Sequence, residues 1–329
     1  MNAPRSPIAV LGGGAWGTAL AQALAAAGTP VRLWARDAAA VAEIGQRHAN
    51  ARYLPGVALD PAIAAIGDLS VALAGASCVL AVTPAQTLAA LCVALGPSLR
   101  PGIPLVLCAK GIDAGSGKLL SAIVRDALPE TPVAALSGPS FAMDVAKGLP
   151  TAVTVAAADM ALATSLAALL STPTLRCYSS DDLAGVEAGG ALKNVMAIAA
   201  GTVSGAGLGA SAQAATVTRG FVELRRIAAS FGARPETLMG LSGLGDLILT
   251  CNSPQSRNFS YGLALGRGEA LEGRPLAEGV ATAGIALRIA SERGIEAPIT
   301  ECVTMILDRR ITVREAVLTL LARPLKSEI

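Results

Sequence analysis

The sequence predicts a two-domain α/β protein in which a doubly wound parallel sheet is followed by an all-helical domain. The chain has 329 residues, which exceeds the length of one typical hydrophobic core. In its first half, short apolar runs alternate with Ala/Leu-rich helical stretches, and after about Tyr178 the strand signals stop. We therefore expect an α/β domain over residues 1–180 and a helical domain over residues 181–329.

Each predicted strand is a short, continuous apolar run, which is typical of a parallel sheet covered on both faces. The strands are expected at residues 8–11, 31–34, 78–82, 105–108, 133–136 and 153–156. Helical stretches between them lie at residues 18–27, 87–95 and 119–128. The spacing of the first strand, first helix and second strand is that of one right-handed crossover unit.

A glycine motif, G-x-G-x-x-G, follows the first predicted strand and precedes the first helix. Gly12 makes the tight turn, Gly14 lets the backbone approach a pyrophosphate, and Gly17 allows the helix to pack against the strand. The helix N-terminus then faces the phosphates. In this strand–turn–helix context the motif predicts a Rossmann-type domain that binds a dinucleotide.

The end of the second predicted strand bears on the choice between NAD(H) and NADP(H). An acidic residue there would accept a hydrogen bond from the ribose 2′-hydroxyl, whereas an arginine accommodates a 2′-phosphate. Arg36 is the first polar residue beyond this strand, and Asp37 follows it. The order favours NADP(H), and Asp37 leaves NAD(H) open; the alternative is that both residues form a solvated turn.

Lys193 lies on an unusual face of the helix expected over residues 181–200. At helical spacing, its neighbours on that face are two glycines, Met196 and Ala197, and no carboxylate lies beside it there. Desolvation lowers the pKa of a lysine, which can then exchange a proton near neutral pH. Lys193 is the candidate general acid/base; the alternative is a lysine whose stem covers apolar surface while its head reaches water.

Two motifs follow predicted strands at their carboxyl ends, where doubly wound sheets bind ligands. Lys110 comes directly after the fourth strand, and the segment 137–142 (SGPSFA) comes after the fifth. We expect a helix over residues 140–147, whose first N–H groups, together with the Ser140 hydroxyl, suit an anionic oxygen. Each motif could also be simple turn chemistry.

The helical half carries two further polar sites. Asp246 follows a flexible, glycine-rich turn over residues 240–245, and Ser256, Arg257 and Asn258 should open another helix. An arginine beside helix-start donors is suited to clamp a phosphate or a carboxylate. Together with the dinucleotide motif and Lys193, these sites point to the reduction of a small phosphorylated ketone.

Composition argues against several other classes of protein. The net charge is +2 without a basic cluster, so we expect no nucleic-acid partner. The longest apolar region, 71–95, is interrupted by Thr83, Pro84 and Gln86, so we expect no membrane span. The first strand begins too soon for a signal peptide. The six cysteines form no CxxC and His48 is the only histidine, so we expect a cytoplasmic protein without a metal site.

From end to end the chain resembles bacterial NAD(P)-dependent glycerol-3-phosphate dehydrogenase. Long and specific motifs carry this resemblance, in the family's order and spacing. They lie at residues 12–21, 53–56, 110–111, 137–142, 187–194, 218–220, 240–250, 256–258 and 278–279.

The resemblance implies interconversion of dihydroxyacetone phosphate and sn-glycerol 3-phosphate with NADP(H) or NAD(H), which feeds phospholipid synthesis. It also implies that Lys193 is the catalytic acid/base. The substrate site implied in this way consists of Lys110, Gly138, Ser140, Lys193, Asp246, Ser256, Arg257 and Asn258. The implied cofactor contacts are Trp16, Arg36, Lys110, Ala142, Arg257, Leu276, Glu278 and Tyr53.

The sequence departs from the family pattern at three places. The segment 83–88 stands where the family usually has Val-Pro and an arginine shortly after, Asp144 replaces a common glutamate, and the segment 211–213 replaces a more usual Asn-Ala-Lys/Arg. These departures bear on cofactor preference and on contacts between helices rather than on the reaction.

Two other functions remain open at this point. A two-domain hydroxy-acid dehydrogenase would share the fold and a catalytic lysine but would reduce a carboxylate substrate. A nucleotide-sensing regulator would bind NAD(P)H without turnover, although the near-neutral helical half offers no partner surface for it. That half is rich in alanine and glycine, which favours a homodimer.

Overall fold

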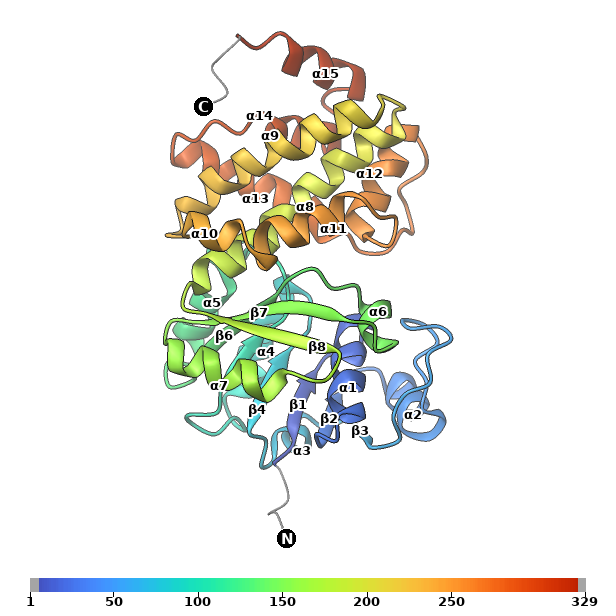
Figure 1. The fold of residues 1–329 in the computed structure, drawn as a ribbon, viewed down its shortest axis with the longest axis vertical. Helices are drawn as coiled ribbons and strands as arrows, with labels where there is room; N and C mark the ends of the chain where they lie inside the picture. The colour runs from blue at the N-terminus through green and yellow to red at the C-terminus, as the bar shows by residue number, and fades with distance from the viewer. Residues whose placement is uncertain (1–5, 325–329) are drawn as a thin grey trace.

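The computed structural model describes residues 6–324, which form two parts stacked along the long axis of the molecule (Figure 1). The lower part holds the sheet and the helices around it, and the upper part is built from helices. The long helix α8 (Leu183–Gly205) leads from the last strand into the upper part. The predicted division at residue 180 coincides with the end of the last strand, and its position as a domain boundary stays a prediction.

The lower part contains one sheet, with the strand order β3-β2-β1-β4-β5-β6-β7-β8. Its strands are β1 (Ile8–Leu11), β2 (Val31–Trp34), β3 (Ile63–Ile66), β4 (Cys78–Ala81), β5 (Leu105–Leu107), β6 (Val133–Ser137), β7 (Thr151–Ala157) and β8 (Leu175–Ser180). The chain first extends the sheet on one side of β1 and then returns to the other side at β4. This reversal is the switch point at which doubly wound sheets bind ligands.

The predicted fold class is confirmed, with one correction to the strand directions. All neighbouring strands are parallel except β6 and β7, which pair antiparallel. The connection between them holds only the short helix α6 (Ala142–Ala146). A parallel pair needs a crossover that returns the chain to the start of the sheet, and one helix of this length cannot span that distance. The chain therefore turns back and runs beside β6 in the opposite direction.

Two strands, β3 and β8, are absent from the sequence prediction. Both lie at the edges of the sheet, where one side has no neighbouring strand. β3 is rich in alanine, and β8 is mostly exposed or half-buried, so neither shows the continuous apolar run of an interior strand. The other predicted strands are confirmed, with ends that differ by one or two residues.

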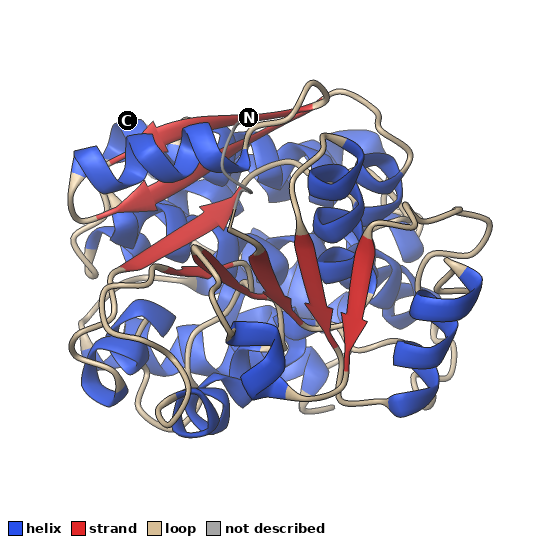
Figure 2. Cartoon of the chain, turned by 90° about the horizontal axis from the view of Figure 1, so that it is seen from below, coloured by secondary structure: helices blue, strands red, loops and turns tan. Residues whose placement is uncertain are grey.

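Helices cover the sheet on both faces (Figure 2). Ile8 and Val10 of β1 face a core completed by helices α1 (Ala15–Ala26), α2 (Ala38–Arg47) and α7 (Met160–Leu170). Ala9 and Leu11 face the opposite core. The helices on that side are α3 (Leu69–Leu73), α4 (Leu88–Leu95), which follows the short turn η1 (Ala85–Thr87), and α5 (Leu120–Ala127). Alternate residues of β1 thus pack into two hydrophobic cores, one on each face of the sheet, as is typical of a parallel sheet covered on both faces.

The upper part is arranged around α8, which is buried along most of its length and packs against helices on several sides. No helix among residues 6–324 is long and apolar enough to cross a membrane. The remaining elements are α9 (Ala210–Ala229), α10 (Pro235–Leu238), the π-helical turn η2 (Leu241–Gly245), α11 (Asp246–Cys251), α12 (Arg257–Arg267), α13 (Glu278–Glu292), α14 (Pro298–Leu307) and α15 (Val313–Leu321).

Helices α8 and α12 touch through their main chains. Gly201 and Gly205 of α8 face Gly262 and Gly266 of α12. A methyl group on Gly201 or on Gly262 would lie 2.1 Å from a carbonyl oxygen of the other helix. Both helices run in the same direction, so the start of α12 lies beside the middle of α8. This contact sets where the residues at the start of α12 stand relative to Lys193.

Glu187 of α8 joins the helical part to the sheet. Its Oε1 accepts a hydrogen bond from the Ser121 N–H at 2.8 Å, near the start of α5. Its Oε2 is buried without a hydrogen-bond partner among the residues that the structure describes. Burial raises the pKa of Glu187 to about 7. A group whose pKa is higher in the folded than in the unfolded state makes stability depend on pH.

We expect Glu187→Gln to flatten the pH dependence of stability. The protonated carboxyl stabilises the fold fully below the unfolded pKa of about 4.3, and this contribution is lost as the pH rises through about 7. Its size is roughly 3–4 kcal/mol. The glutamine amide would keep the acceptor for Ser121 without charge, so the variant should be the more stable protein near pH 8. Urea denaturation at about pH 5 and about pH 8 measures this.

The exposed Glu130 offers a matched control, because Glu130→Gln removes the same charge outside the core. The stability of that variant to urea should match that of the wild type at both pH values. An E187Q protein whose stability varies with pH as much as that of the wild type would contradict the assignment to Glu187.

Candidate active site

The glycine motif lies at the switch point of the sheet and has the geometry that a dinucleotide needs. Gly12 has φ +135°, and a Cβ there would lie 2.8 Å from the carbonyl oxygen of Val82, at the end of β4. A Cβ on Gly17 would lie 1.9 Å from the Gly12 oxygen, so helix and strand pack as expected. Gly14 has open space around it. The residues present therefore fit a pyrophosphate over Gly14 at the start of α1.

Trp16 and Arg36 flank this turn. The Trp16 Nε1 is buried and has no hydrogen-bond partner within residues 6–324. Arg36 lines a pocket of about 530 Å³ between the end of β2 and helix α2. The Asp37 carboxylate accepts a hydrogen bond from the Ala39 N–H at 2.9 Å and so caps α2. Arg36 is thus the charged residue that lines this pocket, whereas the Asp37 carboxylate is engaged as the N-cap of α2.

A carboxylate between two lysines forms the centre of the site. Asp246, the first residue of α11, is buried, with an exposed fraction of 1%. Its Oδ1 lies 2.6 Å from the Lys193 Nζ, and its Oδ2 lies 2.6 Å from the Lys110 Nζ. The sequence placed no carboxylate beside Lys193 on its own helix; the structure supplies one from α11.

Burial and, to a smaller extent, the nearby Lys110 ammonium lower the pKa of Lys193 to about 8, although the Asp246 carboxylate acts to raise it. The Lys193 side chain is 7% exposed, and that of Lys110 is 17% exposed. Lys193 is therefore the more desolvated of the two. A lysine with a pKa near 8 can both give and take a proton close to neutral pH.

Thr250 belongs to this centre and was missed in the sequence. Its Oγ1 lies 2.6 Å from the Lys193 Nζ. Thr250 follows Asp246 by one helical turn on α11, so both side chains face α8. That i, i+4 spacing was the available signal. Lys193 thus has two oxygen partners, which fix the direction of its ammonium.

The turn before Asp246 differs from the prediction of a flexible loop. Residues Leu241–Gly245 form a π-helical turn that continues directly into α11. A Cβ on Gly243 would lie 2.0 Å from the Leu238 carbonyl oxygen, so the glycine here permits close packing. Asp246 is therefore a buried residue at the start of a helix rather than a residue after a flexible loop.

Lys110 is also fixed by the segment that follows β6. Its Nζ donates to the Gly138 carbonyl oxygen at 3.2 Å, and the Ser140 Oγ donates to the same oxygen at 3.1 Å. The helix expected from residue 140 begins at Ala142, because residues 138–141 form an extended turn first. Ser140 therefore lies in this turn and near Lys110, rather than at a helix start.

Two of the segments that depart from the family pattern make visible contacts. In the segment 83–88, Gln86 donates to the Ile112 carbonyl oxygen at 2.8 Å and accepts from the Ala114 N–H at 2.9 Å, so it holds the loop that follows Lys110. In the segment 211–213, Gln213 donates to the Cys251 carbonyl oxygen at 3.0 Å. That bond links α9 to the end of α11.

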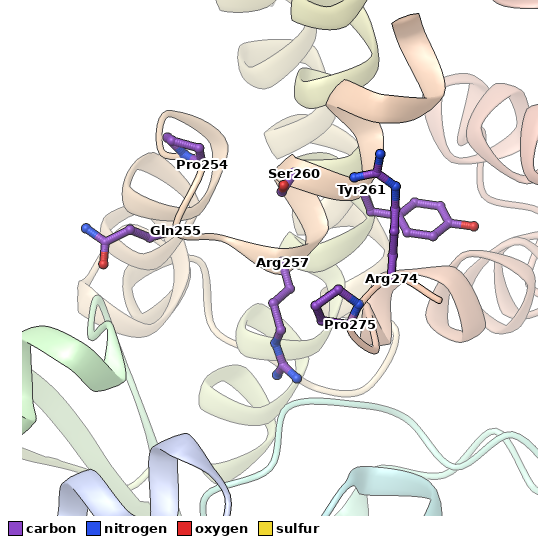
Figure 3. Close-up of a pocket in the computed structure, with 7 residues that line it drawn as sticks. All are labelled: Pro254, Gln255, Arg257, Ser260, Tyr261, Arg274 and Pro275. Atoms are coloured by element: carbon purple, nitrogen blue, oxygen red, sulfur yellow. The ribbon is translucent and has the colours of Figure 1, made fainter. Parts of the chain in front are cut away.

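The start of α12 has the predicted form. The Ser256 Oγ accepts from the Phe259 N–H at 3.2 Å and caps the helix, and the Asn258 Oδ1 accepts from the Gly279 N–H at 2.9 Å. Figure 3 shows the Arg257 guanidinium directed toward the α/β domain at the bottom of the view. A pocket of about 160 Å³ beside it is lined by Pro254, Gln255, Arg257, Ser260, Tyr261, Arg274 and Pro275.

Glu278, the first residue of α13, interacts electrostatically with Arg257, Lys110 and Lys193. Burial raises the pKa of its carboxyl, while the charges of Arg257, Lys110 and Lys193 act to lower it, with the Arg257 contribution the largest of the three. The structure therefore gathers these basic side chains around the carboxylates of Glu278 and Asp246. With more basic than acidic groups, such a site attracts an anionic ligand.

Three predicted cofactor contacts are exposed or half-buried. The Tyr53 residue is 42% exposed, and the Arg52 guanidinium stacks 5.2 Å from its ring centroid. Leu276 is 59% exposed, in the loop before α13. Ala142 is half-buried at the start of α6. Their role as contacts stays a prediction.

Comparison with known proteins agrees with this geometry. Residues 7–163 match the family model of the NAD-dependent glycerol-3-phosphate dehydrogenase N-terminus, and residues 182–318 match that of its C-terminus. Proteins named glycerol-3-phosphate dehydrogenase [NAD(P)+] from Mesorhizobium japonicum and Chelativorans sp. are 68% and 67% identical to this chain. Each alignment covers 98% of this chain, with 93% and 98% of the two relatives.

A solved structure shares the whole fold. The crystal structure of glycerol-3-phosphate dehydrogenase from Coxiella burnetii superposes with a TM-score of 0.92 at 38% identity, over 97% of this chain and 99% of that one. The sequence matches span both parts of the molecule, and the lysine–aspartate centre lies between them. The chain therefore belongs to the NAD-dependent glycerol-3-phosphate dehydrogenase family.

Proposed function

We propose that this chain interconverts dihydroxyacetone phosphate and sn-glycerol 3-phosphate with NADP(H) or NAD(H), and so supplies glycerol 3-phosphate for phospholipid synthesis. The observation that carries the proposal is the buried Lys193, with a pKa near 8, paired with Asp246, which also binds Lys110 beyond the carboxyl end of β5. The family matches and the named relatives support the choice of substrate.

In the proposed mechanism, Lys193 donates a proton to the carbonyl oxygen as the ketone is reduced, and takes it back in the reverse reaction. When bound, the nicotinamide supplies the hydride that reaches the carbonyl carbon. Asp246 and Thr250 direct the ammonium, and its charge stabilises the developing alkoxide in a site from which water is largely excluded. Burial, with a smaller contribution from the Lys110 ammonium, keeps the pKa of Lys193 low enough for proton transfer.

The cofactor would lie along the carboxyl ends of the strands. Gly12, Gly14 and Gly17 would receive the pyrophosphate, and Arg36 would meet a ribose 2′-phosphate in its pocket. We assign the remaining contacts to Trp16, Tyr53, Lys110, Ala142, Arg257, Leu276 and Glu278. The use of Asp37 as a helix cap supports a preference for NADP(H).

The substrate phosphate would bind at the start of α12. Arg257 carries the charge, and the Asn258 amide is oriented because its oxygen is held by Gly279. The remaining substrate contacts are Lys110, Gly138, Ser140, Asp246 and Ser256. Binding energy from the phosphate then aligns the ketone with Lys193.

We expect Arg257→Ala to raise the KM for dihydroxyacetone phosphate by roughly tenfold to a hundredfold, because a charge-assisted contact contributes about 1.5–3 kcal/mol. Steady-state kinetics with varied ketone at saturating NADPH measure this. Arg310→Ala, an exposed arginine after α14, is the control and should leave KM unchanged. An unchanged KM in R257A would show that the substrate phosphate does not bind at Arg257.

The test of the function itself is the loss of absorbance at about 340 nm with dihydroxyacetone phosphate, run in parallel with NADPH and NADH. Rapid oxidation of either cofactor supports the proposal, and the ratio of the two rates reports what Arg36 does. Absence of turnover in protein that binds NADPH would overturn the substrate assignment. Turnover of a phosphate-free keto acid instead would favour the two-domain hydroxy-acid dehydrogenase.

Three broader assignments accompany the function. We propose a dinucleotide-binding domain over residues 1–180 and a catalytic domain over residues 181–329. We also propose a homodimer, supported by exposed apolar side chains such as Leu318 and Leu321 on α15. Finally, we place the protein in the cytoplasm, in keeping with six cysteines that are all free thiols.

A further inference from the structure

A buried amide from outside the glycine motif holds the dinucleotide turn. Asn50 lies in the loop after α2 and is only 1% exposed. Its Nδ2 donates to the Gly13 carbonyl oxygen at 3.0 Å and to the Thr18 Oγ1 at 2.8 Å. Gly13 lies within the turn, and Thr18 lies in the first turn of α1. The amide therefore joins the two ends of the segment over which a pyrophosphate would lie.

Asn50 is itself held firmly in place. The main-chain carbonyl oxygen of Asn50 accepts hydrogen bonds from the Tyr53 N–H at 3.1 Å and the Leu54 N–H at 2.8 Å. Leu54 is buried in the core of the sheet domain. The loop from α2 to β3 is thus anchored by an apolar side chain on one side and tied to the glycine turn on the other.

The chemistry of the contact calls for an amide. Both partners of the Nδ2 group act as acceptors, so the side chain must supply two N–H donors from one atom. An aspartate would offer acceptors only, and its negative charge would lie close to the site of the dinucleotide phosphates. Alanine would leave the half-buried Gly13 oxygen without this partner, which costs binding or folding energy.

We propose that Asn50 is a positioning residue for the dinucleotide: it sets the conformation of the Gly12–Gly17 turn and thereby the affinity for the NAD(P)H pyrophosphate. The proposal rests on the dinucleotide binding proposed above. It assigns to Asn50 an effect on cofactor affinity and none on the proton-transfer centre, which lies on α8 and α11.

The experiment compares wild type, Asn50→Asp and Asn50→Ala by NADPH fluorescence titration and by steady-state kinetics. We expect the Kd and KM for NADPH to rise about tenfold or more in N50D and less in N50A. The kcat at saturating NADPH should stay within about threefold of the wild-type value. Since the repulsion in N50D is electrostatic, added salt should reduce the difference between the Kd values of N50D and N50A for NADPH.

Two further variants separate positioning from a general loss of structure. Thr18→Val removes one acceptor of the pair, so its effect on Kd should not add to that of N50A in the double variant. Asn252→Asp places the same charge on an exposed asparagine whose Nδ2 bonds the Ile248 oxygen, and it should bind NADPH as the wild type does.

Equal affinity for NADPH in the wild type, N50D and N50A would overturn the assignment of Asn50 alone. A fall in kcat with unchanged KM for NADPH would overturn it as well, because the effect would then lie at the reacting centre. A wild-type protein that binds neither NADPH nor NADH would overturn the proposed function together with this assignment.

Discussion

Replacing Lys193 with methionine is expected to lower kcat for ketone reduction by ~10²–10⁴-fold, the usual contribution of a general acid. Methionine has a similar length and suits the apolar, glycine-lined face on which Lys193 lies. The variant leaves the ketone oxygen without a proton donor and without a positive charge beside the developing alkoxide. Affinity for NADPH should change by about twofold or less, because the glycine turn is untouched.

Steady-state kinetics with saturating NADPH and ketone give kcat, and NADPH fluorescence titration gives the affinity. Lys118→Met is the matched control, since Lys118 is exposed and pairs with Asp126 at the surface. It should retain the wild-type kcat. If K193M kept kcat within about tenfold of the wild type, the general-acid role would belong to another group.

Asp246→Asn is expected to reduce both activity and stability. Asp246 raises the pKa of Lys193 against the lowering effects of burial and Lys110. Without the carboxylate, the buried Lys193 ammonium faces the half-buried Lys110 ammonium, so the pKa of Lys193 should fall below about 8. At neutral pH more of the lysine is then a neutral amine, which cannot donate the proton. Activity in the reduction direction should therefore fall at about pH 7 and recover partly as the pH is lowered.

The stability of D246N should also be lower, because breaking one side of a buried ion pair typically costs about 3–5 kcal/mol. Kinetics from about pH 5.5 to pH 9 and urea denaturation check the two effects. Asp126→Asn removes the carboxylate of the exposed ion pair between Lys118 and Asp126, and it should change neither the kinetics nor the stability. A pH–rate profile of D246N that coincides with that of the wild type would show that Asp246 does not set the protonation of Lys193.

Sequence patterns located Lys193 and Asp246 separately but could not show that they touch. The two residues are 53 positions apart in the chain, and no local periodicity reports a contact over that distance. The helix around Lys193 and the capped start of α12 were predicted, because each depends on nearby residues: a face of small side chains in one case and Ser256 as the N-cap in the other.

The features that the sequence did not reveal depend on tertiary contacts. β3 and β8 are edge strands in which most residues are exposed or half-buried, so their pattern differs from that of the interior strands. The antiparallel direction of β7 follows from the length of a connection rather than from the composition of the strand. Asn50 shows no signal at all in its own segment, because its partners Gly13 and Thr18 are 37 and 32 residues away.

The main-chain contact between α8 and α12 has a consequence for the size of the substrate. Lys193 stands on one of these helices and Arg257 on the other, and no side chain separates the helices where Gly201 meets Gly262. Rotamer changes of side chains between the helices therefore cannot alter the distance between the two backbones that carry the proposed proton donor and the proposed phosphate clamp. The contact thus fixes the main-chain positions of the two groups, and only the reach of the Lys193 and Arg257 side chains is left to adapt to the length of the ketone.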